Sequence, residues 1–183
     1  MTSALHTLNR APRAEASAMI APLVERSDWV AELAVDGRPF ASDEDLAEAL
    51  VEQIIAAPPL RRLALFRAHP ALAGREATDG SMTEESTGEQ ARLGLLALRR
   101  DEAARLAALN AHYESRFGHP FIIALHRVPD ITTLFARFES RLSATPIEEH
   151  TTTLAEIASV IRSRTRRAFG IAEAQDSIPS TTP

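Results

Sequence analysis

The stretch of the sequence that decides the fold class is SDEDLAEALVEQIIAAPP, residues 42–59. Ser42 can accept a hydrogen bond from a free N–H group of a helix start, and three acidic residues follow it near the positive end of the helix dipole. Pro58 and Pro59 end the pattern, because the residue before a proline avoids the α conformation. Between these limits the apolar residues form one stripe at helical spacing: Leu46, Ala47, Leu50, Val51, Ile54 and Ile55.

The same spacing extends over most of the chain on both sides of this helix. One further helix should end at Gly118, which can adopt a left-handed conformation, with Pro120 two residues later. Asp130 can cap the start of another, and residues 74–81 are small and polar and predict a loop. The remaining helices are predicted over residues 60–68, 83–98 and 151–169, with two shorter ones around 15–21 and 29–34.

No alternating strand pattern, internal repeat or glycine-rich phosphate loop interrupts these helices. The sequence therefore predicts an all-α fold, a compact single-domain bundle of about seven or eight helices over residues 1–170. Residues 171–183 are predicted to form a disordered tail.

The composition excludes several classes of protein and site. The chain has 183 residues, no cysteine and a net charge of −5. Without cysteine there is no disulfide framework and no thiolate metal site. The acidic balance argues against nucleic acid as a partner, and no apolar stretch is long enough to span a membrane. The first residues lack the pattern of a signal peptide, so we expect a cytoplasmic protein.

His69 is the first candidate for chemistry. It stands at a predicted helix end and is followed by Pro70, so its side chain is held in a fixed place. The ordinary pKa of imidazole suits proton transfer near neutral pH. The alternative is that His69 only contacts the carbonyl groups of the last helical turn.

A second candidate group is Ser86, Glu89 and Gln90, which share one face of a predicted helix. A hydroxyl, a carboxylate and an amide together suit a small ligand rich in N–H and C=O groups. The alternative is a capping box, because Ser-x-x-Glu is also its sequence pattern.

A third candidate is residues 116–124, where a helix end is followed by an apolar segment in irregular backbone. Its main-chain N–H and C=O groups need partners. They could contact a ligand, or they could belong to a buried turn.

Four arginines lie close together near the end of the last helix, and only helical phase distinguishes them. Arg164 extends the apolar stripe of Ile157 and Ile161, whereas Arg162 and Arg166 point away from it. An inward arginine needs a carboxylate, from the protein or from a ligand. No histidine pair has the spacing of a metal site, so we expect no metal.

Together, in their order and spacing, these segments resemble the 2-oxo-4-hydroxy-4-carboxy-5-ureidoimidazoline (OHCU) decarboxylases of purine breakdown. The resemblance covers nearly the whole chain from Leu8 to Phe169. It rests on residues 69–74 (HPALAG), 85–90 (ESTGEQ) and 109–123 (LNAHYESRFGHPFII), and on Trp29–Ala31 and Arg38–Phe40.

The resemblance implies a cofactor-free, homodimeric enzyme. Its activity would be the decarboxylation of the ureidoimidazoline to S-allantoin in urate catabolism. His69, Glu89 and Arg164 match the expected catalytic positions. The expected substrate-binding positions are Pro70, Ser86, Thr87, Gly88, Glu89, Gln90, Phe121, Ile122, Ile123, Ala124 and Leu125.

Three positions depart from the family pattern. Ala71 stands where an aspartate is usual, Gly88 where a serine is common, and Arg164 lacks its usual leucine neighbours. Gly88 is expected to loosen a ligand-binding turn. Ala71 and Gly88 leave open a family member that acts on a related ureido acid. A separate alternative is a helical interaction domain without catalysis, in which Ser86, Glu89 and Gln90 are only caps and His69 is replaceable.

Overall fold

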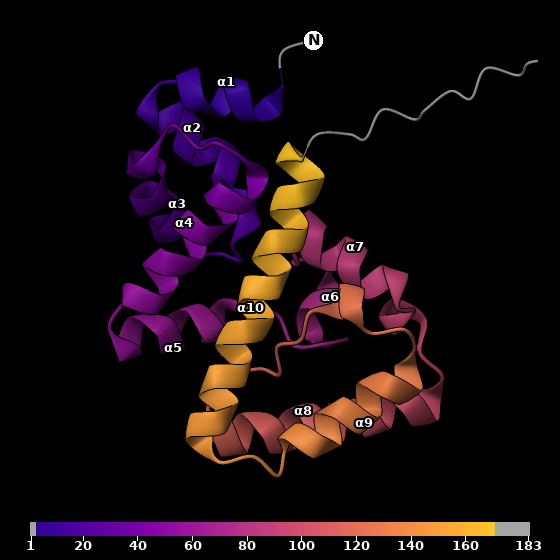
Figure 1. The fold of residues 1–183 in the computed structure, drawn as a ribbon. Coiled ribbons are helices and arrows are strands. Elements are labelled where there is room, and N and C mark those ends of the chain that lie inside the picture. The colour runs from indigo at the N-terminus through magenta and orange to yellow at the C-terminus, as the bar shows by residue number, and fades with distance from the viewer. Residues whose placement is uncertain (1–2, 171–183) are drawn as a thin grey trace, which may run out of the picture.

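The structure, a computed structural model, describes residues 3–170 and is all-α within that range (Figure 1). The predicted tail, residues 171–183, lies outside the described residues. None of the described helices combines the length and the apolar character needed to cross a membrane. The α-helices are α1 (Ala4–Arg10), α2 (Arg13–Ile20), α3 (Asp28–Ala34), α4 (Asp43–Ala56), α5 (Pro59–Ala68), α6 (Arg75–Asp79), α7 (Glu84–Arg92), α8 (Arg100–Phe117), α9 (Ile131–Arg141) and α10 (Pro146–Phe169).

The predicted helix ends are confirmed where a local signal marked them. The hydroxyl of Ser42 accepts a hydrogen bond from the N–H of Asp45 at 3.0 Å. The carboxylate of Asp130 accepts one from the N–H of Thr133 at 2.7 Å. Gly118 follows α8 with a φ of 75°, the left-handed conformation that glycine adopts without strain.

The described residues contain ten α-helices, two more than the upper expectation, and both extra ones are short. The prediction of a loop over residues 74–81 is wrong, because Arg75–Asp79 form α6, which ends at Gly80 with a φ of 74°. No residue of α6 is buried, so the helix has no apolar stripe to reveal it. Helix α1 buries only Leu8, and its seven residues are too few for a periodic pattern.

Two predicted boundaries also differ. Helix α7 ends at Arg92 and not near residue 98, because Gly94 takes a φ of 75° and Leu95–Ala97 form a 3₁₀ turn. Helix α10 begins at Pro146, five residues before the predicted start. Thr145 and Glu148 form a capping box there, ahead of the first apolar residues of the stripe.

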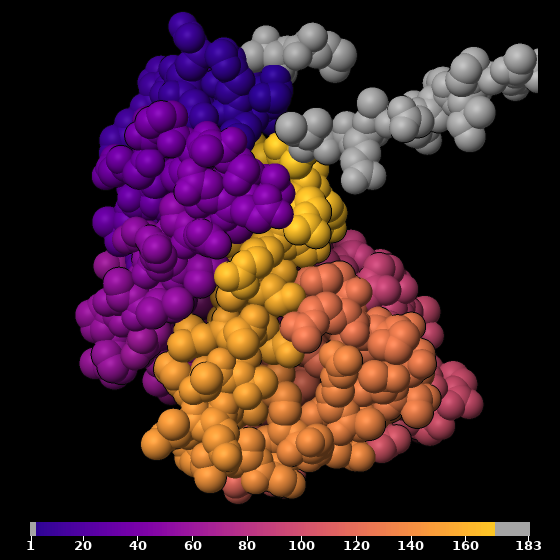
Figure 2. Space-filling view, viewed as in Figure 1, coloured from indigo at the N-terminus to yellow at the C-terminus, as the bar shows by residue number. Residues whose placement is uncertain are grey.

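Two groups of buried apolar residues form the interior, and α10 runs between the elements that build them (Figures 1 and 2). The N-terminal cluster joins helices α1 to α5 to α10 and includes Leu50, Ile54, Ile157 and Ile161. The C-terminal cluster joins α8, α9 and the chain between them, around the rings of Tyr113, Phe121 and Phe138.

Residues 121–125, here named the wall segment, pass between the two clusters without regular secondary structure up to the 3₁₀ turn that begins at Leu125. Successive side chains of an extended segment point to opposite sides. Accordingly, Ile122 belongs to the N-terminal cluster, whereas Phe121, Ile123 and Leu125 belong to the C-terminal cluster. The wall segment is therefore packed from both sides.

Candidate active site

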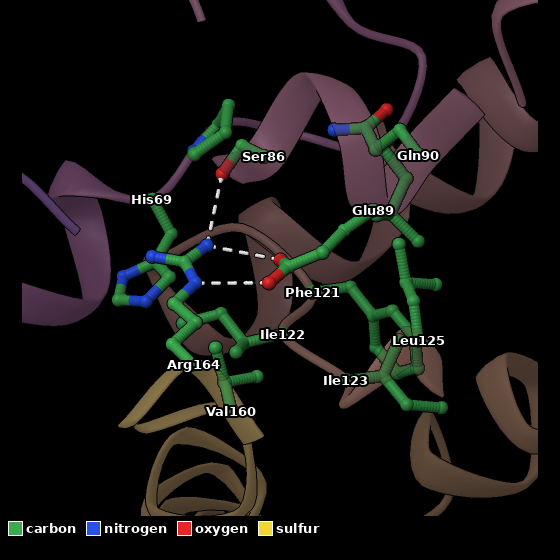
Figure 3. Close-up of a pocket in the computed structure, with 12 residues that line it drawn as sticks. His69, Ser86, Glu89, Gln90, Phe121, Ile122, Ile123, Leu125, Val160 and Arg164 are labelled. Carbon is green, nitrogen blue, oxygen red and sulfur yellow. Dashed lines mark hydrogen bonds and ion pairs between the residues drawn. The ribbon is translucent and has the colours of Figure 1, made fainter. Parts of the chain in front are cut away.

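A pocket lies where four separate parts of the chain meet: the end of α5, helix α7, the wall segment and α10 (Figure 3). Its volume is about 40 Å³, room for about three water molecules at roughly 10–15 Å³ each. The lining residues are His69, Pro70, Leu72, Ser86, Glu89, Gln90, Phe121, Ile122, Ile123, Leu125, Val160 and Arg164.

His69 follows the last residue of α5, and the backbone of Pro70 holds it from the other side. Its Nδ1 lies 2.9 Å from the carbonyl oxygen of Leu65. A carbonyl oxygen only accepts, so the neutral ring carries its proton on Nδ1 and donates it there. No hydrogen bond within residues 3–170 uses Nε2. His69 therefore does contact a carbonyl group of the last turn of α5, as the helix-cap interpretation predicts. The same contact leaves Nε2 free for a ligand.

The pKa of His69 is lowered from its ordinary value of 6.5. Burial is the main cause and the charge of Arg164 adds to it, while the Leu65 carbonyl and the carboxylates of Glu25 and Glu89 oppose the shift. The neutral ring is therefore the main form at pH 7. A neutral ring with an unprotonated Nε2 can act as a general base.

Helix α7 turns Ser86 and Glu89 toward the pocket, but neither residue caps the helix. The cap is Thr83, whose hydroxyl accepts from the N–H of Ser86 at 3.3 Å. The capping-box interpretation of Ser86 and Glu89 is therefore wrong. Ser86 donates its hydroxyl proton to the buried carboxylate of Glu25 at 2.7 Å.

Gln90 lies one residue further along α7 and is almost fully buried. Its side-chain oxygen accepts from the N–H of Ala73 at 2.8 Å, and its amide nitrogen lies 3.2 Å from the sulfur of Met82. The hydrogen bond with Ala73 connects α7 to the turn after His69. Gln90 also lines the pocket.

Arg164 points inward, as its helical phase predicts, with 4% of its surface exposed. Its Nε and Nη2 donate to the two oxygens of Glu89, both at 2.9 Å (Figure 3). Burial works to lower the pKa of Arg164, but the hydrogen bonds and negative charges of Glu89 and Glu25 outweigh burial and raise the pKa. Arg162 and Arg166 are exposed.

Glu25 is a residue that sequence reasoning missed. Only 2% of it is exposed, and it accepts hydrogen bonds from Thr83 at 3.0 Å and from Arg164 at 3.3 Å. It does not line the pocket but lies behind Arg164. The one signal in the sequence is an acidic residue directly after the apolar pair Leu23 and Val24.

The wall segment lines the pocket with four of its five residues. Side chains hold its main chain on either side of Ile123: the carbonyl of Ile122 accepts from Arg141 at 2.6 Å, and the N–H of Ala124 donates to Glu156 at 2.8 Å. Between them, the N–H and the carbonyl of Ile123 form no hydrogen bond within residues 3–170. These main-chain groups are free to contact a ligand.

Three of the positions expected to bind substrate do not line the pocket. Thr87 and Gly88 are exposed on α7, and the hydroxyl of Thr87 donates to the carbonyl of Thr83 at 2.9 Å. Ala124 is buried within the wall segment. Conversely, Leu72 and Val160 line the pocket although the sequence did not single them out.

The expectation that Gly88 loosens a ligand-binding turn is wrong, because Gly88 lies inside α7 with open space around its Cα. We expect Gly88→Ala to raise the free energy of unfolding by about 1 kcal/mol, because glycine disfavours a helix interior. Activity should not change. Gly118→Ala is the control and should destabilise the protein, since Gly118 has a φ of 75°. Thermal unfolding measures both, and a lower melting temperature for Gly88→Ala would contradict the prediction.

Within residues 3–170 there is no group of three or more histidine, aspartate or glutamate side chains arranged to hold a metal ion.

Comparison with known proteins gives consistent matches. The family model described as OHCU decarboxylase matches residues 9–166. The 2-oxo-4-hydroxy-4-carboxy-5-ureidoimidazoline decarboxylase of Amia calva is 37% identical over 142 residues, which are 78% of this chain and 81% of that protein.

Two solved structures share the fold. A crystal structure of OHCU decarboxylase in the presence of (S)-allantoin has a TM-score of 0.65 at 17% identity, and the match covers 84% of this chain and 99% of that one. A crystal structure of (S)-allantoin synthase has a TM-score of 0.69 at 23% identity and covers 90% of this chain, which spans 54% of that longer chain.

Proposed function

The chain belongs to the OHCU decarboxylase family, and we propose that it decarboxylates 2-oxo-4-hydroxy-4-carboxy-5-ureidoimidazoline to S-allantoin in urate catabolism. One observation carries the proposal beyond the family match. His69, Glu89 and Arg164 come from three distant parts of the chain and line one pocket with apolar walls.

The chemistry of the substrate explains why these residue types suffice. One ring carbon carries both the carboxylate and a hydroxyl, beside a ring C=N bond. When carbon dioxide leaves, the electron pair of the broken bond moves into the C=N system, so the substrate is its own electron sink. The protein has to orient the carboxylate, stabilise the enediol-like intermediate and deliver a proton to one face.

We assign proton transfer at the 4-hydroxyl and the reacting carbons to His69. Its Nε2 is unprotonated in the neutral ring and has no protein partner within residues 3–170. It can take the hydroxyl proton and later return a proton to carbon. Arg164 would bind the substrate carboxylate or a neighbouring oxygen, since its guanidinium matches two oxygens at once.

On this proposal the substrate separates Arg164 from Glu89. The cavity of about 40 Å³ is too small for a substituted ring, and the ion pair of these two side chains lies against it. Glu25 holds the far side of Arg164 and is inaccessible, whereas the side chain of Glu89 is 20% exposed. Glu89 is therefore the partner that exchanges, and its freed carboxylate can accept the ureido N–H groups.

The wall segment and Gln90 would complete the site. The free N–H and carbonyl of Ile123 suit the ring and ureido groups of the substrate. Gln90 can contribute once its amide turns from its present partners. A homodimer and a cytoplasmic location are the matching proposals for assembly and compartment, which sedimentation and cell fractionation check.

The deciding experiment generates the unstable substrate in place from urate with a urate oxidase. The appearance of allantoin is followed by circular dichroism with and without this protein. Faster formation of optically active S-allantoin supports the proposal. An unchanged rate and racemic product would favour an interaction domain without catalysis.

The structure gives no reason to prefer a related ureido acid as the substrate. That alternative depended on Ala71 and Gly88, and neither residue lines the pocket. Comparing the rate with the ureidoimidazoline and with other ureido acids tests it directly.

We expect activity to survive exhaustive treatment with EDTA, because the substrate accepts the electron pair without a metal ion. The rate of S-allantoin formation before and after chelation is the measurement. A loss of activity that zinc or manganese restores would overturn this mechanism.

A further inference from the structure

The main chain of the wall segment is held by charged side chains from three helices. Arg141, at the end of α9, donates to the carbonyl of Ile122, and Glu156 of α10 accepts from the N–H of Ala124. Arg92, at the end of α7, donates to the carbonyl of Leu125. An irregular segment has no neighbouring strand to bond with, so these side chains replace the missing main-chain partners.

Arg141 is itself fixed by a buried network. Its Nε donates to both oxygens of Glu149, at 3.0 and 3.1 Å, and Glu149 also accepts the hydroxyl proton of Tyr113. The guanidinium lies 4.5 Å from the ring centre of Phe121. The side chain of Arg141 is 12% exposed and that of Glu149 only 1%. Arg141 therefore contacts two neighbouring residues of the wall segment from a rigid base.

The two anchored main-chain groups flank Ile123, whose own N–H and carbonyl form no hydrogen bond within residues 3–170. The positions and directions of the Ile123 N–H and carbonyl therefore depend on where Ile122 and Ala124 are held. Substrate groups bound to Ile123 would take their orientation from these two anchors. The orientation of the ring decides which of its faces lies toward the proton donor.

We propose that Arg141 and Glu156 are positioning residues, which hold the wall segment so that the ring is protonated on one face only. The inference rests on the proposed function and deepens it. Neither side chain lines the pocket, so both act through the main chain of the wall segment. The product stereochemistry reports on this role, because protonation of a loosely held intermediate on either face gives both enantiomers of allantoin.

Arg141→Lys is the first test. Lysine keeps a positive charge beside Glu149, which preserves the fold, but a single ammonium cannot contact Glu149 and the Ile122 carbonyl as the guanidinium does. We expect kcat to fall about 10-fold with a smaller change in KM, since misplacement by 1 Å can cost up to about 100-fold. The fraction of the S enantiomer should fall in parallel. Arg105→Lys is the matched control, because Arg105 forms an exposed ion pair with Glu139.

Glu156 offers a second test with its own rescue. Glu156→Leu removes the acceptor for the N–H of Ala124 and should lower both kcat and the S fraction. Glu156→Gln keeps a carbonyl oxygen at the same place and should restore most of both. If the two variants behave alike, Glu156 does not act through this hydrogen bond.

Hydrogen exchange of the amides of residues 122–125 separates this inference from the proposed function. It should be faster in Arg141→Lys and in Glu156→Leu than in the unmodified protein, whatever the substrate is. Faster exchange with an inactive unmodified protein would reject the proposed function alone. Unchanged exchange, or a lower melting temperature with unchanged kcat and enantiomeric purity, would overturn the positioning role.

Discussion

His69→Asn is expected to abolish turnover while the protein stays folded. Removal of a general acid or base lowers the rate by roughly 10²–10⁴-fold. The side chain also donates one hydrogen bond to Leu65, whose loss costs about 1 kcal/mol and does not unfold a domain of this size. Stopped assays of S-allantoin formation, together with thermal unfolding, measure both effects.

His112→Asn is the matched control, since His112 is exposed on α8. It should leave the rate unchanged. If His69→Asn retains near-normal activity at unchanged stability, His69 is only a helix cap and the proposed proton transfer has to be reassigned.

The pH dependence of kcat/KM gives a further test of His69. Its pKa is lowered below 6.5, mainly by burial, so the unprotonated base persists to lower pH than in a free histidine. The acid limb of the profile should therefore fall below pH 6.5. Because the pKa of His69 is lower in the folded protein, the unfolded chain binds a proton at a higher pH than the folded protein does. The free energy of unfolding should therefore fall as the pH drops from 6.5 toward the lowered pKa.

Substitution of Arg164 is expected to have the second large effect. Two different substitutions separate its role in substrate binding from its role in stability. Arg164→Lys keeps the charge beside Glu25 but lacks the planar fork, so kcat/KM should fall up to about 100-fold. Arg164→Leu leaves Glu25 buried without its cation, which should cost about 3–5 kcal/mol of folding free energy. Denaturant unfolding and allantoin kinetics on the same preparations distinguish the two.

Arg162→Lys and Arg166→Lys are the controls on the same helix. Both side chains are exposed, and the ion pair of Arg166 with Glu44 is 71% and 63% exposed, so each change should cost little. Equal losses at all three positions, or a loss of stability without a kinetic change in Arg164→Lys, would remove Arg164 from the site.

The sequence predicted the parts of the fold that depend on local chemistry. Ser42, Asp130 and Gly118 mark helix ends through their own backbone or side-chain hydrogen bonds, so no distant residue is needed to identify them. The inward phase of Arg164 likewise follows from the stripe of its own helix. Helix α6 was not predicted, because a polar helix without buried residues has no periodic apolar pattern.

The rest of the site depends on contacts between distant residues. Ser86 fits the pattern of a cap, but Thr83 caps α7 and the hydroxyl of Ser86 donates to Glu25, a residue distant in the sequence. Glu25 could not be recognised because its burial requires a partner 139 residues away in the sequence. The resemblance to a family also indicated Thr87, Gly88 and Ala124, and none of these residues lines the pocket.

The ion pair of Glu25 with Arg164 also has a consequence for synthesis of the protein. Glu25 leaves the ribosome 139 residues before Arg164 does. Until α10 is made, the N-terminal cluster lacks Ile157 and Ile161 and its carboxylate lacks a cation. A buried unpaired charge is strongly unfavourable, so we expect the nascent chain to keep Glu25 in contact with water until Arg164 is made. The pocket is therefore complete only once the last helix has been made, and we expect a chain truncated before Arg164 to lack the site.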